Sequence, residues 1–128
     1  MGGRTRVAVN SISGRGGPVM ASVFNSKAQI LKIYVPERRM KDDQPLCEWI
    51  VHRACERGIA GATVIRGNGG YYLNDPVKSP EIISMQVMRP VIIEIVDQPE
   101  RIEGFAAFLK SEVSQVLMCR SDVDVCFS

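Results

Sequence analysis

The stretch PVIIEIVD at residues 90–97 is the most apolar part of the chain and decides its fold. Only Glu94 interrupts the apolar run, and a near-continuous run of this length is typical of a strand in the middle of a sheet. Asp97 is followed by Pro99 and then by Glu100, a spacing that predicts a capping box with proline in the first helical turn. The segment therefore predicts a central strand that passes directly into a helix.

The chain after residue 97 continues this pattern as a helix and a final strand. Residues 115–127 alternate between apolar and polar side chains, as expected of a strand with one covered face. The apolar stripe that the helix is expected to bury has helical spacing and consists of Ile102, Phe105, Ala106, Leu109 and Val113.

The chain before this stretch repeats the same order of elements. Residues 30–35 predict a strand that Pro36 ends, because proline cannot donate to a strand ladder. Pro45 predicts the beginning of a helix, with Asp43 or Gln44 as its cap. The stripe of this helix is Leu46, Ile50 and Ala54.

Gly58 is predicted to end the first helix in a left-handed conformation, and residues 62–66 predict a short second strand. The complete order is strand, helix, strand, strand, helix, strand. Two right-handed crossover units of this kind form an α+β, ferredoxin-like fold with a four-stranded antiparallel sheet and both helices on one face. The first and third strands are expected in the middle.

The 128 residues leave room for one domain, expected at residues 29–128. Residues 1–28 are rich in Gly, Ser and Arg and predict a disordered tail, and the natural start is left open between Met1 and Met20. The tail carries four basic side chains and no acidic one, whereas the domain holds 12 basic and 14 acidic side chains. This near-neutral balance argues against a nucleic-acid-binding domain.

The four cysteines form no C-x-x-C pair, and His52 is the only histidine, so no metal site or cofactor is predicted. The cysteines are interpreted as buried, reduced thiols of a cytoplasmic protein. No secretory signal is expected, and the longest apolar run is far shorter than the ~20 residues of a membrane span. The chain is therefore not expected to be membrane-embedded.

The 23 residues between Arg66 and Pro90 are too many for a tight hairpin, and such long loops are often functional. Gly67, Gly69 and Gly70 form its root. They either let the chain leave the sheet sharply or present backbone N–H groups as an anion-binding nest beside Arg66. The loop residues that could contact a partner are Tyr71, Tyr72, Asn74, Asp75 and Lys78.

Four strings of the sequence carry a resemblance. They are LKIYV at 31–35, PL at 45–46, ERGIAGATVIRG at 56–67 and PVIIEIVD at 90–97. Together they resemble the PII-like family catalogued as domain of unknown function 190, over roughly residues 29–126. The resemblance implies a homotrimer, related to PII signalling proteins and CutA proteins, whose three sheets line a central core.

The resemblance also implies a function. PII proteins bind adenine nucleotides in clefts between subunits, at the glycine-rich loop root, and the loop then engages a partner such as a membrane transporter. Carried over to this chain, backbone contacts come from the glycines, and Arg66 with Arg38 or Arg39 neutralises the anion. The ligand-binding residues so assigned are Arg66, Gly67, Gly69, Gly70, Arg38 and Arg39.

One segment departs from the PII pattern and leaves other functions open. Residues 114–122 stand where PII proteins carry a second, glycine-containing phosphate loop, yet they contain no glycine and only Arg120 as a cation. The ligand is thus an adenine nucleotide, another small anion, or none. The second hypothesis is a ligand-free structural or interaction trimer, and a CutA-like metal-tolerance role is third. An enzyme is the weakest hypothesis, because His52 is the only histidine available as a base.

Overall fold

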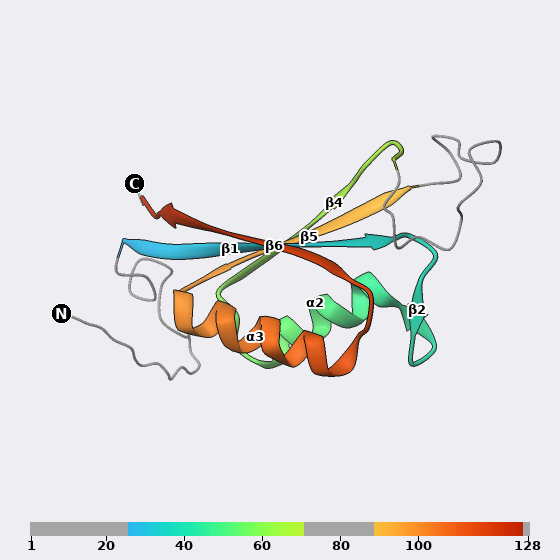
Figure 1. The fold of residues 1–128 in the computed structure, drawn as a ribbon, viewed down its shortest axis with the longest axis horizontal. Coiled ribbons are helices and arrows are strands. Elements are labelled where there is room, and N and C mark those ends of the chain that lie inside the picture. Colours follow the sequence, from blue (N-terminus) through green and yellow to red (C-terminus); the bar gives the residue numbers. More distant parts are fainter. Residues whose placement is uncertain (1–25, 71–88, 127–128) are drawn as a thin grey trace, which may run out of the picture.

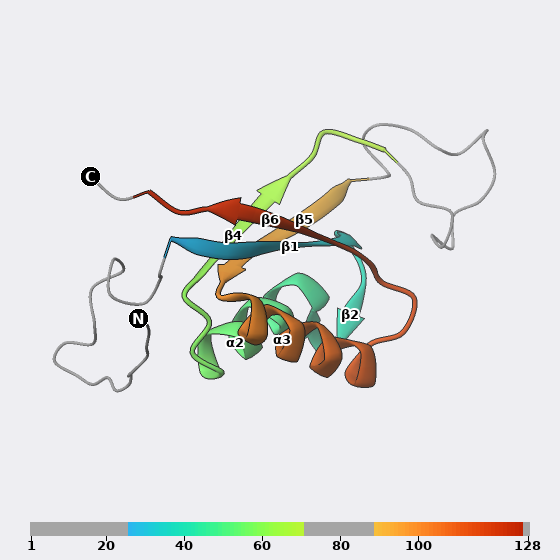
Figure 2. The ribbon, with the colours of Figure 1, turned by 60° about the vertical axis from the view of Figure 1, so that its left-hand side comes forward.

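The computed structural model describes residues 26–70 and 89–126. Its main sheet is antiparallel with the strand order β4-β5-β1-β6 (Figure 1). The two helices, α2 and α3, both cover one face of this sheet (Figures 1 and 2). The bounds are β1 Lys27–Pro36, α2 Leu46–Glu56, β4 Gly61–Arg66, β5 Pro90–Asp97, α3 Pro99–Glu112 and β6 Leu117–Asp124. The predicted α+β, ferredoxin-like order and the central positions of β1 and β5 are confirmed.

The core lies between the central strands and the helices. Leu31 pairs with Ile95 and Ile33 with Ile93, so alternate residues of β1 and β5 point to the same covered face. Each of these four side chains is at most 1% exposed. Their main partners on the helices are Leu46, Trp49, Ile50, Ala54, Ile102, Phe105 and Leu109. Val113, which was predicted within the apolar stripe of the helix, is the residue that follows α3 and packs at the edge of this core.

The opposite face of the sheet is covered by no helix or strand of the described residues, and we call it the open face. Its register places three rows of side chains across the four strands. The first row is Ile65, Ile92, Tyr34 and Leu117; the second is Thr63, Glu94, Lys32 and Cys119; the third is Gly61, Val96, Ile30 and Ser121. The open face is therefore apolar on both sides of a polar middle row.

A small hairpin between β1 and α2 was not predicted. Its strands are β2 (Met40–Lys41) and β3 (Gln44–Pro45), joined by Asp42 and Asp43 at φ angles of 52° and 65°. Two loop residues with positive φ define a type I′ turn. The expected cap of α2 by Asp43 or Gln44 is wrong, because both residues belong to this hairpin and the N-cap position is held by Pro45 without a side-chain hydrogen bond. Gly58, by contrast, follows α2 at φ 75° as predicted.

The hairpin turn yields a stability prediction. Asp43 is held in a left-handed conformation that glycine adopts without steric cost. We expect Asp43→Gly to raise the free energy of unfolding by about 0.5 kcal/mol, since type I′ turns favour Asp-Gly. Urea denaturation measures the change. Glu103→Gly, at an exposed position within α3, is the control and should lower it by about 1 kcal/mol; a loss of stability in both variants would contradict the prediction.

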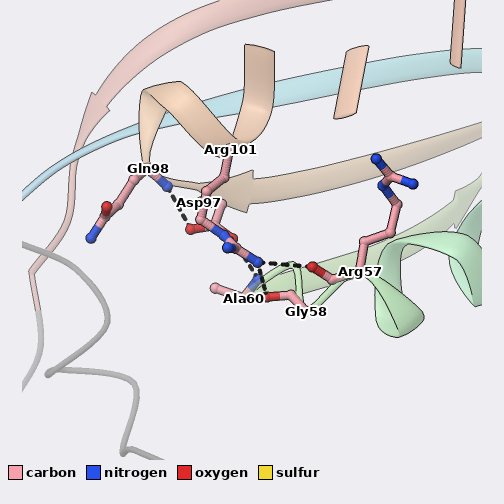
Figure 3. A network of polar contacts seen from close by, with 6 residues as sticks. All are labelled: Arg57, Gly58, Ala60, Asp97, Gln98 and Arg101. Carbon is pink, nitrogen blue, oxygen red and sulfur yellow. Dashed lines mark hydrogen bonds and ion pairs between the residues drawn. The ribbon is translucent and has the colours of Figure 1, made fainter. Parts of the chain in front are cut away.

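Asp97 has a different role from the predicted capping box. The N-cap of α3 is Gln98, which makes no side-chain cap, and the Asp97 carboxylate is fully buried. Its Oδ1 accepts a bond from the Gln98 N–H at 2.7 Å, and its Oδ2 accepts bonds from the Ala60 N–H and the Arg101 Nε, both at 2.9 Å (Figure 3). The capping box is therefore wrong, because the N-cap is Gln98 and the Asp97 carboxylate is bonded to Gln98, Arg101 and the distant Ala60.

Arg101 extends this network to the end of α2. Its Nη2 donates to the carbonyl oxygens of Arg57 at 2.9 Å and Gly58 at 2.6 Å. These carbonyls follow the last turn of a helix, where backbone acceptors lack partners within the helix. The Asp97–Arg101 pair thus joins the end of β5 and the start of α3 to the turn between α2 and β4 (Figure 3).

The sequence interpretation of the cysteines is only partly right. Cys47 is buried, but the other three cysteines are exposed. Cys55 lies on the outer side of α2, Cys119 on the open face and Cys126 beyond β6.

The predicted tail lies outside the described residues up to residue 25, and its last two residues already belong to β1. Neither helix in 26–70 and 89–126 is long and apolar enough to cross a membrane.

Candidate functional site

The root of the long loop is fixed by contacts between Gly67 and Pro90. The sheet ladder ends where Arg66 pairs with Val91, and the Gly67 N–H then donates to the Pro90 carbonyl at 2.9 Å. A Cβ at Gly67 would lie 2.7 Å from the Pro90 Cγ, which is too close for a ring that cannot move away. Residue 67 is therefore glycine because the chain passes directly against Pro90 as it leaves the sheet.

This geometry reduces the number of backbone N–H groups that the predicted anion nest can offer. The Gly67 N–H is already bonded to Pro90, so any contact with an anion falls to the N–H groups of the following glycines. Gly70 has a φ of 147°, a conformation that side chains rarely adopt, and Gly69 is half-buried. Contacts from Gly69 and Gly70 remain predictions. The predicted partner residues Tyr71, Tyr72, Asn74, Asp75 and Lys78 lie outside the described residues.

The turn after β1 lies against the same root. The Glu37 N–H donates to the Arg89 carbonyl at 3.0 Å, and the Glu37 Oε2 pairs with the Arg66 Nη1 at 3.2 Å. Arg38 follows directly and is exposed, as is Arg89. The structure therefore places the turn of Arg38 at the loop root, together with Glu37 and Arg89, which sequence reasoning did not include; a contact of Arg38 with a ligand stays a prediction.

Arg39 is directed elsewhere. Its Nη1 donates to the Gln115 carbonyl at 3.1 Å and its Nη2 to the Ser114 carbonyl at 2.6 Å. Both acceptors belong to the connection between α3 and β6, where Gln115 has a φ of 55°. The guanidinium therefore stabilises the connection between α3 and β6, which contains no glycine. Of the two arginines in this turn, Arg38 is the one that could contact a ligand at the loop root.

An open surface pocket, which we call the cavity, lies beside β4, the edge strand that leads into the loop. Its volume is about 310 Å³, and it opens between α2 and the helix-facing side of β4. Its lining residues are Cys47, Glu48, Val51, His52, Val64 and Arg66. Arg66, the predicted cation, is thus the last residue of β4, part of the cavity wall and part of the loop root at once.

The lining has distinct apolar and charged parts. Val51, Val64 and Cys47 provide apolar surface, whereas Arg66, His52 and Glu48 provide polar groups. Ligand sites in proteins commonly have volumes of about 300–1,000 Å³ and combine apolar walls with a few polar groups. A volume near the lower bound fits a molecule of mononucleotide size or smaller. No three His, Cys, Asp or Glu side chains gather as a possible metal site within the part of the chain that the structure describes.

Sequence reasoning found Arg66 but not the cavity. Glu48 and His52 are four residues apart on α2, and Val64 and Arg66 are two apart on β4, so each pair shares a face of its own element. The packing of this helix face against the edge strand comes from tertiary structure. His52 is the only histidine of the chain, and the sequence contained no signal that places this exposed side chain beside Arg66.

Comparisons with known proteins identify the family. The model of the DUF190 family, described as "Uncharacterized ACR", matches residues 28–125. A UPF0166 protein of Aquifex aeolicus is 30% identical over 101 residues, which cover 79% of this chain and 95% of that protein. The UPF0166 protein MJ1524 of Methanocaldococcus jannaschii is 40% identical over 76 residues, 59% of this chain and 69% of that one.

Two solved structures share the fold. A PII-like signaling protein from Thermus thermophilus superimposes with a TM-score of 0.54 at 15% identity, over 77% of this chain and 89% of that one. The CPII protein of Thiomonas intermedia K12, in a structure with ADP, AMP and acetate bound, gives a TM-score of 0.55 at 13% identity, over 79% and 90%. These likenesses concern the fold. Since the family model matches most of its length, this chain belongs to the DUF190 family, and its fold is PII-like.

Proposed function

We propose that this protein is a PII-like regulatory protein that binds a small anionic ligand, first of all an adenine nucleotide, at the cavity beside β4. The observation that carries the proposal is the position of Arg66, which lines the cavity and also forms the root of the long loop. A ligand held by Arg66 would therefore contact the segment that is expected to engage a partner. The proposed role is regulation in the cytoplasm, not catalysis.

The cavity suits the two chemical parts of a nucleotide. Its valine side chains offer apolar surface for a base, and Arg66 offers two parallel N–H donors for a phosphate group. Gly69 and Gly70 follow Arg66 closely enough to add backbone N–H groups, and the exposed Arg38 adds positive charge. The CPII structure with ADP and AMP supports this ligand class, because that protein has the same fold.

The ion pair between Arg66 and Glu37 suggests how ligand binding could be sensed. The two side chains are 57% and 37% exposed, and exposed pairs contribute only about 0–1 kcal/mol. A phosphate group can therefore replace Glu37 as the partner of Arg66 at little cost. The Glu37 N–H also donates to the carbonyl of Arg89 at the far end of the loop, so the residue that loses its ion pair is in contact with both ends of residues 67–89. We propose that a partner such as a membrane transporter responds to that change.

We also propose that the protein assembles as a homotrimer through its open face. Ile65 is 41% exposed and Leu117 is 45% exposed at the two ends of the first row, so apolar area remains uncovered in the single chain. Contiguous apolar patches of this kind mark interaction surfaces. A second and third copy would cover the row and place the cavities near subunit boundaries.

The test is isothermal titration calorimetry with ATP, ADP, AMP and cyclic dinucleotides. At least one nucleotide should bind, and Arg66→Ala should weaken its affinity about tenfold or more, because a bidentate charged contact is lost. Lys110→Ala, which removes an exposed cation of α3 outside the cavity, is the control and should leave affinity unchanged. Absence of binding by every nucleotide, or equal affinities for wild type and Arg66→Ala, would contradict the proposal.

The Arg66–Glu37 pair also favours a second candidate, the ligand-free interaction trimer, because it satisfies the cation without a ligand. The same titration separates the two candidates. A protein that binds no nucleotide but sediments as a trimer would support the second candidate.

A further inference from the structure

The middle row of the open face carries two opposite charges that the proposed function does not use. Lys32 on β1 and Glu94 on β5 are register partners on the two central strands of the sheet. Four other pairs of opposite charge form ion pairs within residues 26–70 and 89–126, but neither Lys32 nor Glu94 takes part in an ion pair or a hydrogen bond there. The two charges are therefore neighbours in the sheet without being partners in the single chain.

Apolar side chains lie on both sides of these two charges. The flanking positions of the open face on the same two strands, all half-buried, are Ile30, Tyr34, Ile92 and Val96. Any surface that covers the apolar rows would also remove water from the charged row between them. Burying a charge without a partner costs more than the neighbouring apolar contacts recover. A partner that covers the open face must therefore bring an opposite charge to both Lys32 and Glu94.

A second copy of this chain meets that requirement. In a closed ring of three copies, each boundary joins two different patches, so a residue of one copy can contact a different residue of the next. Each copy brings one lysine and one glutamate, and the ring can pair all of them. We infer that Lys32 of one copy forms an ion pair with Glu94 of the next and that this pair fixes the register in which the open faces meet. The inference rests on the proposed homotrimer.

The alternation of apolar and polar rows gives this pair its selectivity. If two copies slipped by one row, a charged side chain of one copy would lie against an apolar side chain of the other and would lose both water and its partner. A protein without matching charges would be rejected for the same reason. The charged row thus selects identical copies and sets where the cavity beside β4 lies relative to a subunit boundary.

Reversal of the two charges tests the pair. Lys32→Glu leaves two acidic side chains at the two positions and Glu94→Lys leaves two basic ones, so every boundary of the ring would join like charges. Wild type should sediment with the mass of three chains, and each variant should need a protein concentration at least about tenfold higher to assemble. The variant with both substitutions restores opposite charges and should assemble as wild type does.

A mixture of the two single variants distinguishes a pair between copies from a pair within one chain. In a ring that contains both variants, two of the three boundaries join opposite charges, because one variant is acidic and the other basic at these positions. Equal amounts of the two, one of them labelled with nitrogen-15, should therefore give mixed rings in native mass spectrometry. A pair within one chain would be repulsive in each variant with or without the other, and mixing would restore nothing.

Lys27→Glu is the matched control. The Lys27 Nζ lies 2.8 Å from the Asp124 Oδ1 on β6, so this reversal also places two acidic side chains opposite each other on neighbouring strands. Lys27 belongs to the helix-facing side of β1, the side of Leu31, and not to the open face. The variant should remain a trimer. Equal circular dichroism spectra are expected and show that each variant is folded.

The outcomes separate the inference from the proposed trimer. If wild type is a trimer and both single reversals assemble equally well, or if the mixture contains no rings of both variants, the pair between copies is overturned and the trimer stands. If wild type itself sediments as a single chain, the inference and the proposed trimer both fail. Nucleotide binding is decided independently by the calorimetric titration.

Discussion

Asp97→Ala is expected to lower the free energy of unfolding by about 2–3 kcal/mol, the cost of removing a buried acceptor and leaving buried N–H donors unsatisfied. Asp97 is 0% exposed and its two oxygens accept three hydrogen bonds. Alanine would leave the Gln98 N–H, the Ala60 N–H and the Arg101 Nε without their acceptor and would open a small cavity at the end of β5. Urea denaturation followed by circular dichroism measures the change, at one fixed protein concentration because assembly also contributes to stability.

Two controls show whether the loss comes from this network. Asp97→Asn keeps one carbonyl acceptor but loses the charge, so its effect should fall between wild type and Asp97→Ala. Asp122→Ala removes an exposed carboxylate that accepts a single bond from Gln29, and it should cost less than about 1 kcal/mol. A loss below about 1 kcal/mol for Asp97→Ala would mean that the contacts in Figure 3 contribute little to holding the junction of β5 and α3 to the turn between α2 and β4.

Ile92→Glu is expected to convert the proposed trimer into monomers. Ile92 lies in the middle of the first row of the open face, between Ile65 and Tyr34, so assembly through this face would bury the introduced carboxylate. Burying an unpaired charge costs several kcal/mol, more than a contact of modest size can offset. Analytical ultracentrifugation at equal concentrations should give the mass of three chains for wild type and of one chain for the variant.

Ala107→Glu provides the matched control for this substitution. Residue 107 is an exposed position of α3, on the far side of the helix layer from the open face. The variant introduces the same charge and should remain a trimer. If Ile92→Glu also remains a trimer while folded, the open face is not the assembly surface.

The fold could be predicted from sequence because its signals are local and periodic. Residues 90–97 and 31–35 show the continuous apolar character of central strands, and the register of β1 with β5 confirms their pairing. Gly58 and Pro99 mark helix ends through backbone preferences that act within one turn. Such signals require no knowledge of distant residues.

The errors arose where distant residues compete for a local group. Asp97 and Glu100 have the spacing of a capping box, but the Asp97 carboxylate is bonded to Ala60, 37 residues earlier in the chain. Arg39 was named with Arg38 as an alternative cation for the ligand from its position after the first strand, and its guanidinium is bonded to carbonyls 75 and 76 residues away. Sequence spacing does not show which acceptor a long side chain reaches.

The candidate site was predictable only where its signals are local in the sequence. Arg66 and Gly67 follow from the end of a strand and the beginning of an oversized loop, both of which the sequence shows. The cavity depends on the packing of α2 against β4, so His52 and Glu48 could be placed beside Arg66 only in the structure. The contact of Gly67 with Pro90 likewise joins residues at the two ends of the loop.

The central claim is that a nucleotide occupies the cavity beside β4. Backbone amide chemical shifts, recorded by NMR during titration with the nucleotide that calorimetry finds to bind most tightly, test it directly. The account predicts that the largest shifts occur at residues 47–52 of α2 and 64–70 at the end of β4. Shifts confined to the connection between α3 and β6, or to the central strands of the open face, would contradict it.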